Sequence, residues 1–503
     1  MESKTDKITK LALQRGFYYP AAEIYPNAPA GFWDYGPSGS SLKRKILDEW
    51  RHKLTRLESG IEIDGAQILP RDVFKSSGHL DSFADPIVTC KKCGHTERAD
   101  KLLEEKLGVP FAEGAPTEHT SKLIKENKIV CTKCKGEFGE VRKFNLMMKV
   151  GVGANNDVEC YLRPEACQSI FLDFNRLYKS GRIKFPVGIA QAGKAFRNEI
   201  SPRNYLLRER ELGQMDVEVF FDPKQIDDAE KFKDVENEKI RLTLPDDTTV
   251  KEITARDLVS KKVVSGKLIA YWLVRAKQYY EGLGIPSTAI KFRGLNKEER
   301  AFYSGETWDL EVLTDSGWVE LMACNYRTDY DLTVHAKGSG QKITCRRENN
   351  EEFTPHIFEL SAGIDRTVYC VMEHAYRSEK KKEELREWLA LPARIAPIEV
   401  GIFPLMKKDG LAEKAFELHE QLIKLGIDSL YDEAGSIGKR YARADEVGCP
   451  YCITIDYDTL KDGTVTLRER DSTEQKRVKM SEIPGLLEAL RKGTNSFKEI
   501  GKI

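Results

Sequence analysis

The chain has 503 residues, of which 40% are hydrophobic and 32% are charged, and its 80 Lys and Arg residues balance its 80 Asp and Glu residues. This length predicts two to four domains of about 150 residues each, and a zero net charge leaves any nucleic-acid partner to local basic patches. No stretch approaches the ~20 apolar residues that a membrane span needs, and the first residues lack the apolar core of a secretion signal. We therefore expect a cytoplasmic protein with no membrane association.

The first strong pattern along the chain is an amphipathic helix over residues 38–58. Its apolar residues recur on one helical face, and they are Leu42, Ile46, Leu47, Trp50 and Leu54. The segment that follows alternates like a strand and ends at Pro70. These elements begin the main domain.

Residues 89–143 form the next distinct segment, which contains four cysteines in two pairs. Cys90 and Cys93 make one C-x-x-C pair, and Cys131 and Cys134 make the other. Two such turns can present four thiolates tetrahedrally to Zn²⁺, and the odd total of eleven cysteines argues against a disulfide framework. We predict an inserted module with a structural zinc site; four unrelated reduced thiols or a redox dithiol are the alternatives.

The run from Phe196 to Phe221 places arginines beside acids. Gln214, Asp216 and Glu218 alternate with apolar residues, which predicts a strand with one apolar face. A solvated edge strand is the simplest interpretation. However, the preceding strand also carries charges, and the loop between them reads Ser-Pro-Arg-Asn (201–204). This arrangement favours a hairpin whose opposite charges point into one cleft.

From residue 225 to 299 the chain is rich in Lys and Glu, with a hairpin expected near Leu244 and a helix over Gly266–Gly282. We interpret this segment as a second insertion that rejoins the main domain at its end. The next hairpin carries acids on both arms, with Asp309 and Glu311 on the first and Glu320 on the second. Several antiparallel strands with acids on one side predict one large sheet with a polar floor.

Residues 391–503 alternate strand and helix patterns, which predicts a small α/β domain with a mixed sheet. The stretch 389–397 is its linker, and Gly426 is expected to end its first helix. A third C-x-x-C pair, Cys449 and Cys452, stands alone on a buried-type strand. We interpret these two cysteines as core residues rather than as a metal or redox site.

The chemistry of the predicted cleft rests on arginines and carboxylates. Arginine binds phosphate bidentately, and facing acids can hold Mg²⁺ or a substrate ammonium. Residues 355–370 add Glu359, Ser361 and Arg366, with small residues that allow a ligand to approach closely. Together they predict a nucleotide bound beside an amino group. His79 is the one suggestive histidine, and a loop-ordering role explains it equally well.

Several stretches resemble the three signature motifs of class II aminoacyl-tRNA synthetases. WDYGPSGSSLKRKILDEW through ILPRDVFKSSGH is similar to the first motif, the run 196–221 to the second, and SAGIDR to the third. LRPEACQ, RNEISPRN and ELSAGIDR together resemble the glycyl-tRNA synthetase family of the archaeal and eukaryotic dimeric type. RYARADEVGCPYCITIDYDTL extends the likeness into that family's anticodon-binding domain.

This resemblance implies an α+β fold with a class II synthetase antiparallel sheet flanked by helices, a zinc-binding insertion and a C-terminal α/β anticodon-binding domain. It divides the chain into catalytic-core segments 1–88, 144–224 and 300–390, insertions 89–143 and 225–299, and the anticodon-binding domain 391–503. The first motif ordinarily forms a dimer interface, so a homodimer is expected. The apolar stripe of residues 38–58 fits that interface or a core helix equally well.

The implied activity is ATP-dependent ligation of glycine to tRNA(Gly) through a glycyl-adenylate. By motif position, Arg197 holds the α-phosphate, Glu199 binds the adenine edge, Arg208 reaches the terminal phosphates and Arg366 lies over the adenine. Arg197, Glu199 and Arg366 are thus the catalytic candidates. Leu212 also belongs to the ATP site, although relatives often stack an aromatic residue there.

The remaining implied roles concern Mg²⁺ and glycine. Glu320, with Glu311 or Asp309 nearby, is expected to hold Mg²⁺. The residues expected around the glycine ammonium are Glu165, Asp216, Glu359 and Ser361, and Gln214 is a further residue expected in the glycine site. Arg327 is the candidate for the glycine carboxylate. Asp216 departs from the family pattern, in which a glutamate is common.

Two other functions compete with this interpretation. A non-catalytic synthetase-like accessory subunit that binds nucleic acid would lose the arginines and acids, which this chain keeps. A class II synthetase for another amino acid is disfavoured by Glu165, Glu359 and Ser361. In the C-terminal domain, the stretch from Gly438 to Arg443 is either a phosphate-contacting loop or a solvated run of charge.

Overall fold

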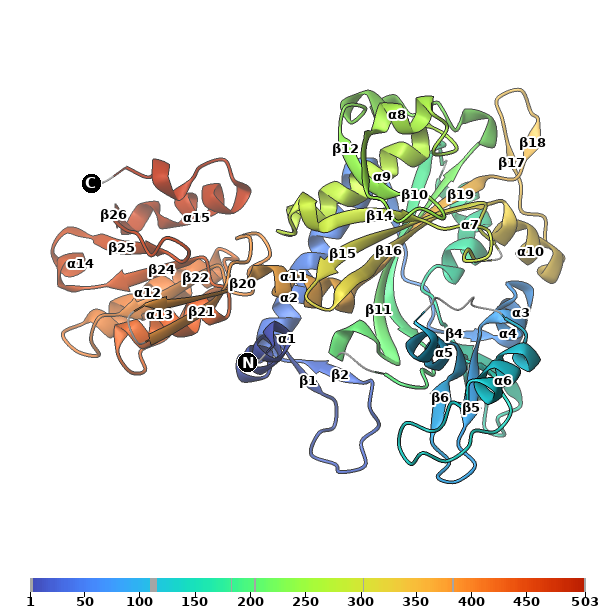
Figure 1. The fold of residues 1–503 in the computed structure, drawn as a ribbon. Helices are drawn as coiled ribbons and strands as arrows, with labels where there is room; N and C mark the ends of the chain where they lie inside the picture. The colour runs from blue at the N-terminus through green and yellow to red at the C-terminus, as the bar shows by residue number, and fades with distance from the viewer. Residues whose placement is uncertain are drawn as a thin grey trace.

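The computed structural model describes residues 3–108, 115–181, 183–202, 205–301, 303–381 and 384–501. Figure 1 shows a large N-terminal body and a smaller C-terminal body, which meet near α11 (Ile364–Ala375) and β20 (Tyr376–Lys381). Each body has its own sheet and its own hydrophobic core. Among the helices of the described residues, none is long and apolar enough to cross a membrane.

A nine-stranded sheet forms the centre of the large body. Its strands, in spatial order, are β13 (Lys251–Thr254), β12 (Lys239–Thr243), β14 (Ile290–Gly294), β15 (Glu306–Thr314), β16 (Gly317–Thr328), β19 (His356–Gly363), β11 (Glu211–Phe221), β10 (Val187–Phe196) and β3 (Ile61–Glu62). All neighbours pair antiparallel except β12 with β14 and β10 with β3. The predicted antiparallel sheet and the hairpin of β10 with β11 are therefore confirmed.

Helices cover both faces of this sheet. The face that carries Met215 and Val217 packs against α2 (Pro37–Trp50), α9 (Lys267–Gly282) and α11. The opposite face packs partly against α7 (Gln168–Gly181) and α10 (Tyr330–Ser339). Because apolar and polar residues alternate along β11, each face receives one set, as the period-2 pattern predicts.

The helix predicted over residues 38–58 is α-helical only to Trp50, after which a π-helical turn (Arg51–Thr55) and a 3-10 turn (Arg56–Glu58) follow. Leu42, Ile46, Trp50 and Leu54 are at most 1% exposed within the single chain. These apolar side chains are therefore buried in the protomer's own core. They give no support to a dimer interface.

The segment 225–299, expected as a second insertion, does not form a separate body. Its strands β12, β13 and β14 extend the edge of the central sheet, and α9 lies in the same hydrophobic core. The expected hairpin near Leu244 is the antiparallel pair β12–β13. β14 pairs with β12 on one side and, on the other, with β15, which follows in the main domain, so the segment is continuous with the central sheet.

The cysteine-containing module is built on a three-stranded sheet of β5 (Ala84–Thr89), β6 (Thr96–Arg98) and β7 (Arg142–Asn145). Two helices, α5 (Ala99–Leu107) and α6 (Thr117–Glu126), complete a small core of its own. Figure 1 shows this module hanging below the central sheet, beside the end of β11.

The C-terminal domain contains a five-stranded mixed sheet, as predicted. Its order is β23 (Ser429–Tyr431), β22 (Val400–Pro404), β24 (Tyr451–Ile455), β25 (Thr464–Glu469) and β26 (Gln475–Lys479). Three of its helices are α12 (Leu411–Lys424), α13 (Ile437–Glu446) and α15 (Ile483–Lys492). A hairpin of β20 with β21 (Glu384–Leu389), which the sequence pattern did not indicate, precedes it and joins it to the large body. Arg386 in this hairpin donates hydrogen bonds to Asp445 of α13.

Candidate active site

A cleft of about 260 Å³ opens on the polar face of the central sheet. Ten of the predicted site residues line it: Glu165, Arg197, Glu199, Arg208, Leu212, Gln214, Glu320, Glu359, Ser361 and Arg366. They come from distant parts of the chain, namely β11, β16, β19, the start of α11 and the loops before α7 and after β10. Asp216, Arg327 and Glu311 do not line the cleft.

The polar side of β11 lies at and beneath this cleft rather than at a solvated edge: Gln214 lines the cleft, and Asp216 and Glu218 are buried under it. Gln214, Asp216 and Glu218 are 6%, 0% and 0% exposed. β11 lies between β10 and β19, so both of its edges are paired. The charges of the hairpin therefore face an enclosed space, although Arg203 and Asn204 of its loop lie outside the described residues.

One half of the cleft holds arginines that are tied to nearby acceptors. Arg208 donates through Nε to Glu199 Oε2 at 2.7 Å, and its Nη2 lies 2.6 Å from the same oxygen. Arg366 donates from Nε to the carbonyl of Leu207 and from Nη1 to the carbonyl of Glu320, both at 3.1 Å. Its Nη1 also lies 3.6 Å from Glu320 Oε2. These guanidinium groups remain partly exposed and can exchange partners.

The same half contains groups that the motifs did not single out. Phe83, which follows α4 (His79–Ser82), lines the cleft and lies under the guanidinium of Arg197, 5.4 Å from its Cζ. Arg197 also donates to the carbonyl of Pro164 at 3.1 Å. An aromatic residue just before the inserted module is the only sequence signal for Phe83.

Glu320 and Glu311 lie opposite each other on β16 and β15. Glu320 is half-exposed, with only a loose contact to Arg366. In contrast, the carboxylate of Glu311 lies 3.1 Å from Lys291 Nζ and 3.2 Å from Arg293 Nε. Because two cations of β14 already neutralise Glu311, the residues fit a Mg²⁺ bound through Glu320 rather than through Glu311.

The other half of the cleft is a closed network around Glu359. Its Oε1 accepts a hydrogen bond from Arg327 Nη1 at 2.9 Å, and its Oε2 accepts one from Asn325 Nδ2 at 2.7 Å. Ser361 donates to Asp216 Oδ1 at 2.7 Å. This half therefore offers carboxylates whose positions are fixed before any ligand arrives.

Arg327 lies beneath the cleft and is 1% exposed. Its Nε and Nη2 donate to Asp331 at 2.6 and 2.8 Å, and its Nη1 donates to Glu359. The guanidinium also lies over the rings of Tyr303 and Phe171. The predicted direct grip on a ligand carboxylate does not match this position. Arg327 instead orients Glu359.

His79 is buried and lies beside Glu165. Its Nε2 is 3.3 Å from Glu165 Oε2, and its Nδ1 shares a hydrogen bond with Ser77 Oγ at 2.8 Å. Burial alone would raise the pKa of Glu165, but His79, Arg327 and Arg197 together hold it well below the ordinary value. His79 therefore keeps Glu165 ionised and in place, which supports the loop-ordering role.

The pKa values of two acids beneath the cleft, Asp216 and Glu218, are raised rather than lowered. Burial, with the nearby Glu359 charge adding to it, raises the pKa of Asp216 to about 8. Glu218, to which no sequence motif gives a role, has its pKa raised well above the ordinary value by burial and then by Glu359. Carboxyl groups in such surroundings favour the neutral form.

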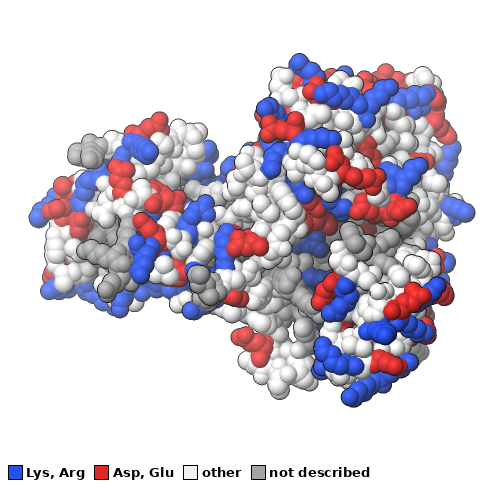
Figure 2. All heavy atoms as spheres, viewed as in Figure 1, with Lys and Arg blue, Asp and Glu red and all other residues white. Residues whose placement is uncertain are grey.

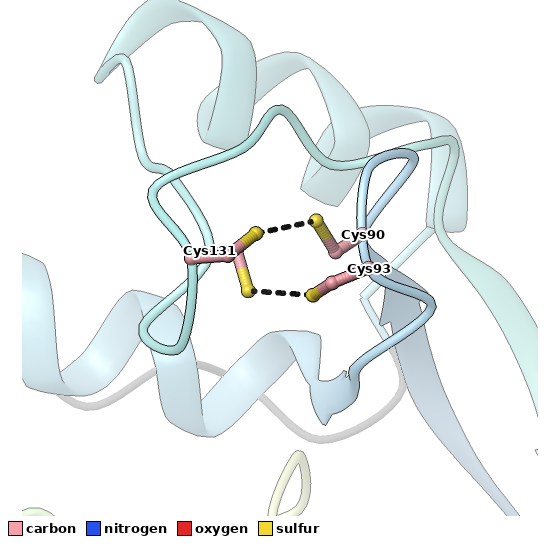
Figure 3. A group of neighbouring side chains, drawn as sticks. Cys90, Cys93 and Cys131 are labelled. Carbon is pink, nitrogen blue, oxygen red and sulfur yellow. Dashed lines mark hydrogen bonds between the residues drawn. The ribbon is translucent and has the colours of Figure 1, made fainter.

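Four cysteines of the inserted module converge, as Figure 3 shows for the two sides of the group. Cys90 Sγ lies 3.6 Å from Cys134 Sγ, and Cys93 Sγ lies 3.8 Å from Cys131 Sγ. All four sulfur atoms lie within 4.8 Å of one another. A backbone N–H from Cys93 lowers the pKa of Cys90 to about 7. Four thiols at these distances fit a tetrahedral Zn²⁺.

Two features of the C-terminal domain are structural. Cys449 and Cys452 are at most 1% exposed, and burial raises the pKa of Cys452 well above the ordinary value, as expected for core thiols. Arg440, expected at a phosphate-contacting loop, is 3% exposed and donates to the backbone carbonyls of Pro404, Glu433 and Gly435. It therefore holds the loop together, whereas Lys439 stays exposed.

Comparisons with known proteins agree with this architecture. The family described as "tRNA synthetase class II core domain (G, H, P, S and T)" matches residues 148–375, and the family described as "Anticodon binding domain" matches residues 399–490. A solved structure, titled as the RNA binding domain of threonyl-tRNA synthetase from Cryptosporidium parvum, superposes with a TM-score of 0.60. It covers 96% of this chain and 98% of its own, and at 17% identity it shows the fold alone.

The most informative matches extend over nearly the whole chain. Glycine–tRNA ligase of Pyrococcus abyssi is 39% identical, with 97% of this chain and 98% of that protein aligned. The enzyme of the same name from Methanothrix thermoacetophila is 36% identical, with 99% and 98% aligned. The chain therefore belongs to the glycine–tRNA ligase family of class II aminoacyl-tRNA synthetases.

Proposed function

We propose that this protein is a glycine–tRNA ligase that joins glycine to tRNA(Gly) in two steps. In the first, a carboxylate oxygen of glycine attacks the α-phosphorus of ATP, the bond to the bridging oxygen breaks, and pyrophosphate leaves. In the second, the glycyl-adenylate passes its glycyl group to the 3′ end of the tRNA. The observation that carries the proposal is one cleft with arginines in one half and fixed carboxylates in the other.

The arginine half suits ATP. Arg197 would hold the α-phosphate, Arg208 the terminal phosphates, and Arg366 would lie over the adenine with Leu212 as an apolar neighbour. Glu199 would release Arg208 and accept from the adenine edge. Such chemistry depends on positioning and on neutralising the charge that develops, so it needs no side-chain base.

The carboxylate half suits the ammonium of glycine. Glu165, Gln214, Glu359 and Ser361 line it, and Asp216 acts through its hydrogen bond from Ser361. With the ammonium there, the glycine carboxylate points toward Arg197 and the α-phosphate. Gln214 itself is held by the Ala166 N–H at 2.9 Å, so the walls cannot easily yield to a larger side chain.

Two metal ions are part of the proposal. Glu320 would hold Mg²⁺, which neutralises phosphate charge when bound. The four cysteines would hold a structural Zn²⁺. Metal analysis of the purified protein should give one zinc per chain, and Cys93→Ser should lose it. Cys160→Ser, which changes a cysteine outside this group, should keep it. Equal zinc in both variants would contradict the site.

The partners follow from family membership. The C-terminal domain would contact the tRNA anticodon, and Figure 2 shows Lys and Arg side chains along the lower rim of this domain. A homodimer in the cytoplasm is proposed on the same ground, and light scattering of the purified protein tests the assembly.

The decisive experiment is ATP–pyrophosphate exchange measured with each amino acid in turn. Glycine should stimulate exchange well above the others, and tRNA(Gly) should then accept the glycine. Exchange with none of them would identify an accessory subunit. A preference for another amino acid would identify a sister enzyme.

A further inference from the structure

Asp216 and Glu218 lie side by side on the buried face of β11, beneath the carboxylate half of the cleft. Both are 0% exposed. Asp216 Oδ2 and both carboxyl oxygens of Glu218 have no hydrogen-bond partner. An ionised carboxylate without partners is very unfavourable in such a place, whereas a neutral acid is tolerable.

The surrounding elements supply more negative than positive groups. The ionisable groups that face this pair are Arg163, Glu165, Cys167, Arg327, Asp331 and Glu359. Arg327 is engaged by Asp331 and Glu359, and His79 lies against Glu165. Arg163 is the remaining cation among these described groups, and its Nε and Nη1 donate to the carbonyls of Lys194 and Gly65. Asp216 and Glu218 are thus two acids with at most one cation to share.

We propose that glycine enters this pocket in exchange for a proton. When the glycine ammonium lies against Ser361 and Glu359, the carboxyl of Asp216 ionises. Its O–H bond breaks, the electron pair stays on the carboxylate, and the proton passes to the buffer, so one positive charge leaves as another arrives. Glu218, two residues further along the same face of β11, keeps its proton both in the empty pocket and with glycine bound.

The inference rests on the proposed glycine site and adds a pH dependence to it. In the empty pocket the pKa of Asp216 is about 8, and the adjacent ammonium lowers it. Because the free protein then binds more protons than the complex, glycine affinity rises with pH from about 6 to about 8, by up to ~tenfold for each pH unit. Above that range Asp216 is already ionised and the dependence flattens.

Calorimetric titration of the whole protein tests the exchange directly. The probe is glycyl-sulfamoyl-adenosine, a stable analogue of the adenylate with a free ammonium, and adenosine is the reference that lacks it. At pH 7 the binding heat of the analogue should differ between PIPES and imidazole buffers. The difference, divided by the difference in the ionisation enthalpies of the two buffers, should give close to one released proton per site. Adenosine should show no such difference. A buffer-independent heat for the analogue would overturn the proposal.

Two variants locate the proton. Asp216→Asn should abolish the release, while Glu218→Gln, which keeps the shape of a neutral acid, should preserve it. Release that survives Asp216→Asn would overturn the assignment. The KM for glycine of the unmodified protein is a second measurement that needs no variant, and it should fall from pH 6 to pH 8. A flat profile would contradict the exchange, whereas the absence of glycine-dependent exchange at every pH would contradict the proposed function itself.

Discussion

The two halves of the cleft solve the problem of holding charge in opposite ways. In the ATP half, the side chains of Arg208 and Arg366 are 29% and 37% exposed, and each is tied to one or two neighbours. In the glycine half, Arg327 is 1% exposed, its three nitrogens donate to Asp331 and Glu359, and its guanidinium packs against the rings of Tyr303 and Phe171. The arginines of the ATP half are therefore partly exposed to solvent and can exchange partners, and we call it the hydrated half. The arginine of the glycine half is buried in a closed network, and we call this the sealed half.

This difference matches the ligands that we propose for each half. ATP brings several charges that arginines can follow as the phosphates move, and partly hydrated groups do this at little free-energy cost. Glycine brings no side chain to grasp, so selectivity depends on walls that do not yield. Rigidity in that half comes from buried ion pairs, whose members cannot be removed singly without leaving a charge behind.

The largest effect should follow Arg327→Met. Loss of the guanidinium leaves Asp331 and Glu359 buried without their cation, which typically lowers the free energy of unfolding by about 3–5 kcal/mol. Urea denaturation measures it. The matched control is Arg366→Met in the hydrated half, which should shift stability by no more than ~0.5 kcal/mol. Equal shifts in the two variants would erase the distinction between the halves.

Arg366→Ala should instead affect the reaction. Because Arg366 would lie over the adenine, its loss should misplace the ATP relative to the glycine carboxylate, and such misplacement can lower the rate about 10²-fold. We expect this loss in glycine-dependent ATP–pyrophosphate exchange. The melting temperature should stay unchanged because the side chain is partly exposed. Arg256→Ala, on α8 (Ala255–Ser260), removes another exposed arginine and should leave exchange unaltered. Activity retained by Arg366→Ala would remove it from the ATP site.

Ser361→Gly should relax selectivity in the sealed half. The change opens space for one extra methyl group and frees Asp216 Oδ1, so the ratio of alanine to glycine activation should rise about tenfold or more, since one methyl group is worth ~1–3 kcal/mol. Exchange assays with both amino acids give the ratio. Ser361→Ala loses the hydroxyl but keeps the Cβ. It therefore distinguishes the effect of added space from the effect of losing the hydrogen bond to Asp216. A ratio that stays constant would show that other walls exclude alanine.

Local patterns predicted the parts of the site that lie on one element or in one short motif. Alternation along residues 214–221 gave the β11 floor, and the two C-x-x-C pairs gave the cysteine group. The C-terminal domain followed from its strand and helix order. These signals depend on spacing along the chain, so they do not require knowledge of the tertiary partners.

Contacts with a partner that is remote in the sequence did not follow from local patterns. The resemblance implies that Arg327 binds the glycine carboxylate, whereas the structure pairs it with Asp331 and with Glu359 on the neighbouring strand. The resemblance places Glu311 near Mg²⁺, whereas the structure pairs it with Lys291 and Arg293 of β14. The contact of His79 with Glu165 and the contact of Phe83 with Arg197 cross between segments in the same way. Sequence spacing carries no record of such neighbours.

The smallest effect concerns Asp85. It tests whether the burial of a charged side chain, or the half of the cleft in which it lies, determines how far solvent screens its charge. Asp85 belongs to β5 of the cysteine module, 8% exposed, with Arg98 Nη1 at 3.0 Å and Arg208 Nη2 at 3.9 Å. It thus lies at the hydrated half but is itself buried. Burial raises its pKa to about 6, although Arg98 opposes the shift.

Because the folded-state pKa lies above the ordinary 3.8, the stability from the proton on Asp85 is fully present below about pH 4 and is lost as the pH rises through 6. The free energy of unfolding should therefore fall less between pH 4 and pH 7.5 in Asp85→Asn than in the unmodified protein. The two decreases should differ by on the order of 2 kcal/mol. Urea midpoints at both pH values measure the difference. Asp81→Asn, an exposed acid nearby, should follow the unmodified protein. If Asp85→Asn follows it too, the hydrated surroundings of the ATP half screen even a buried acid, and location rather than burial decides which charges are sealed.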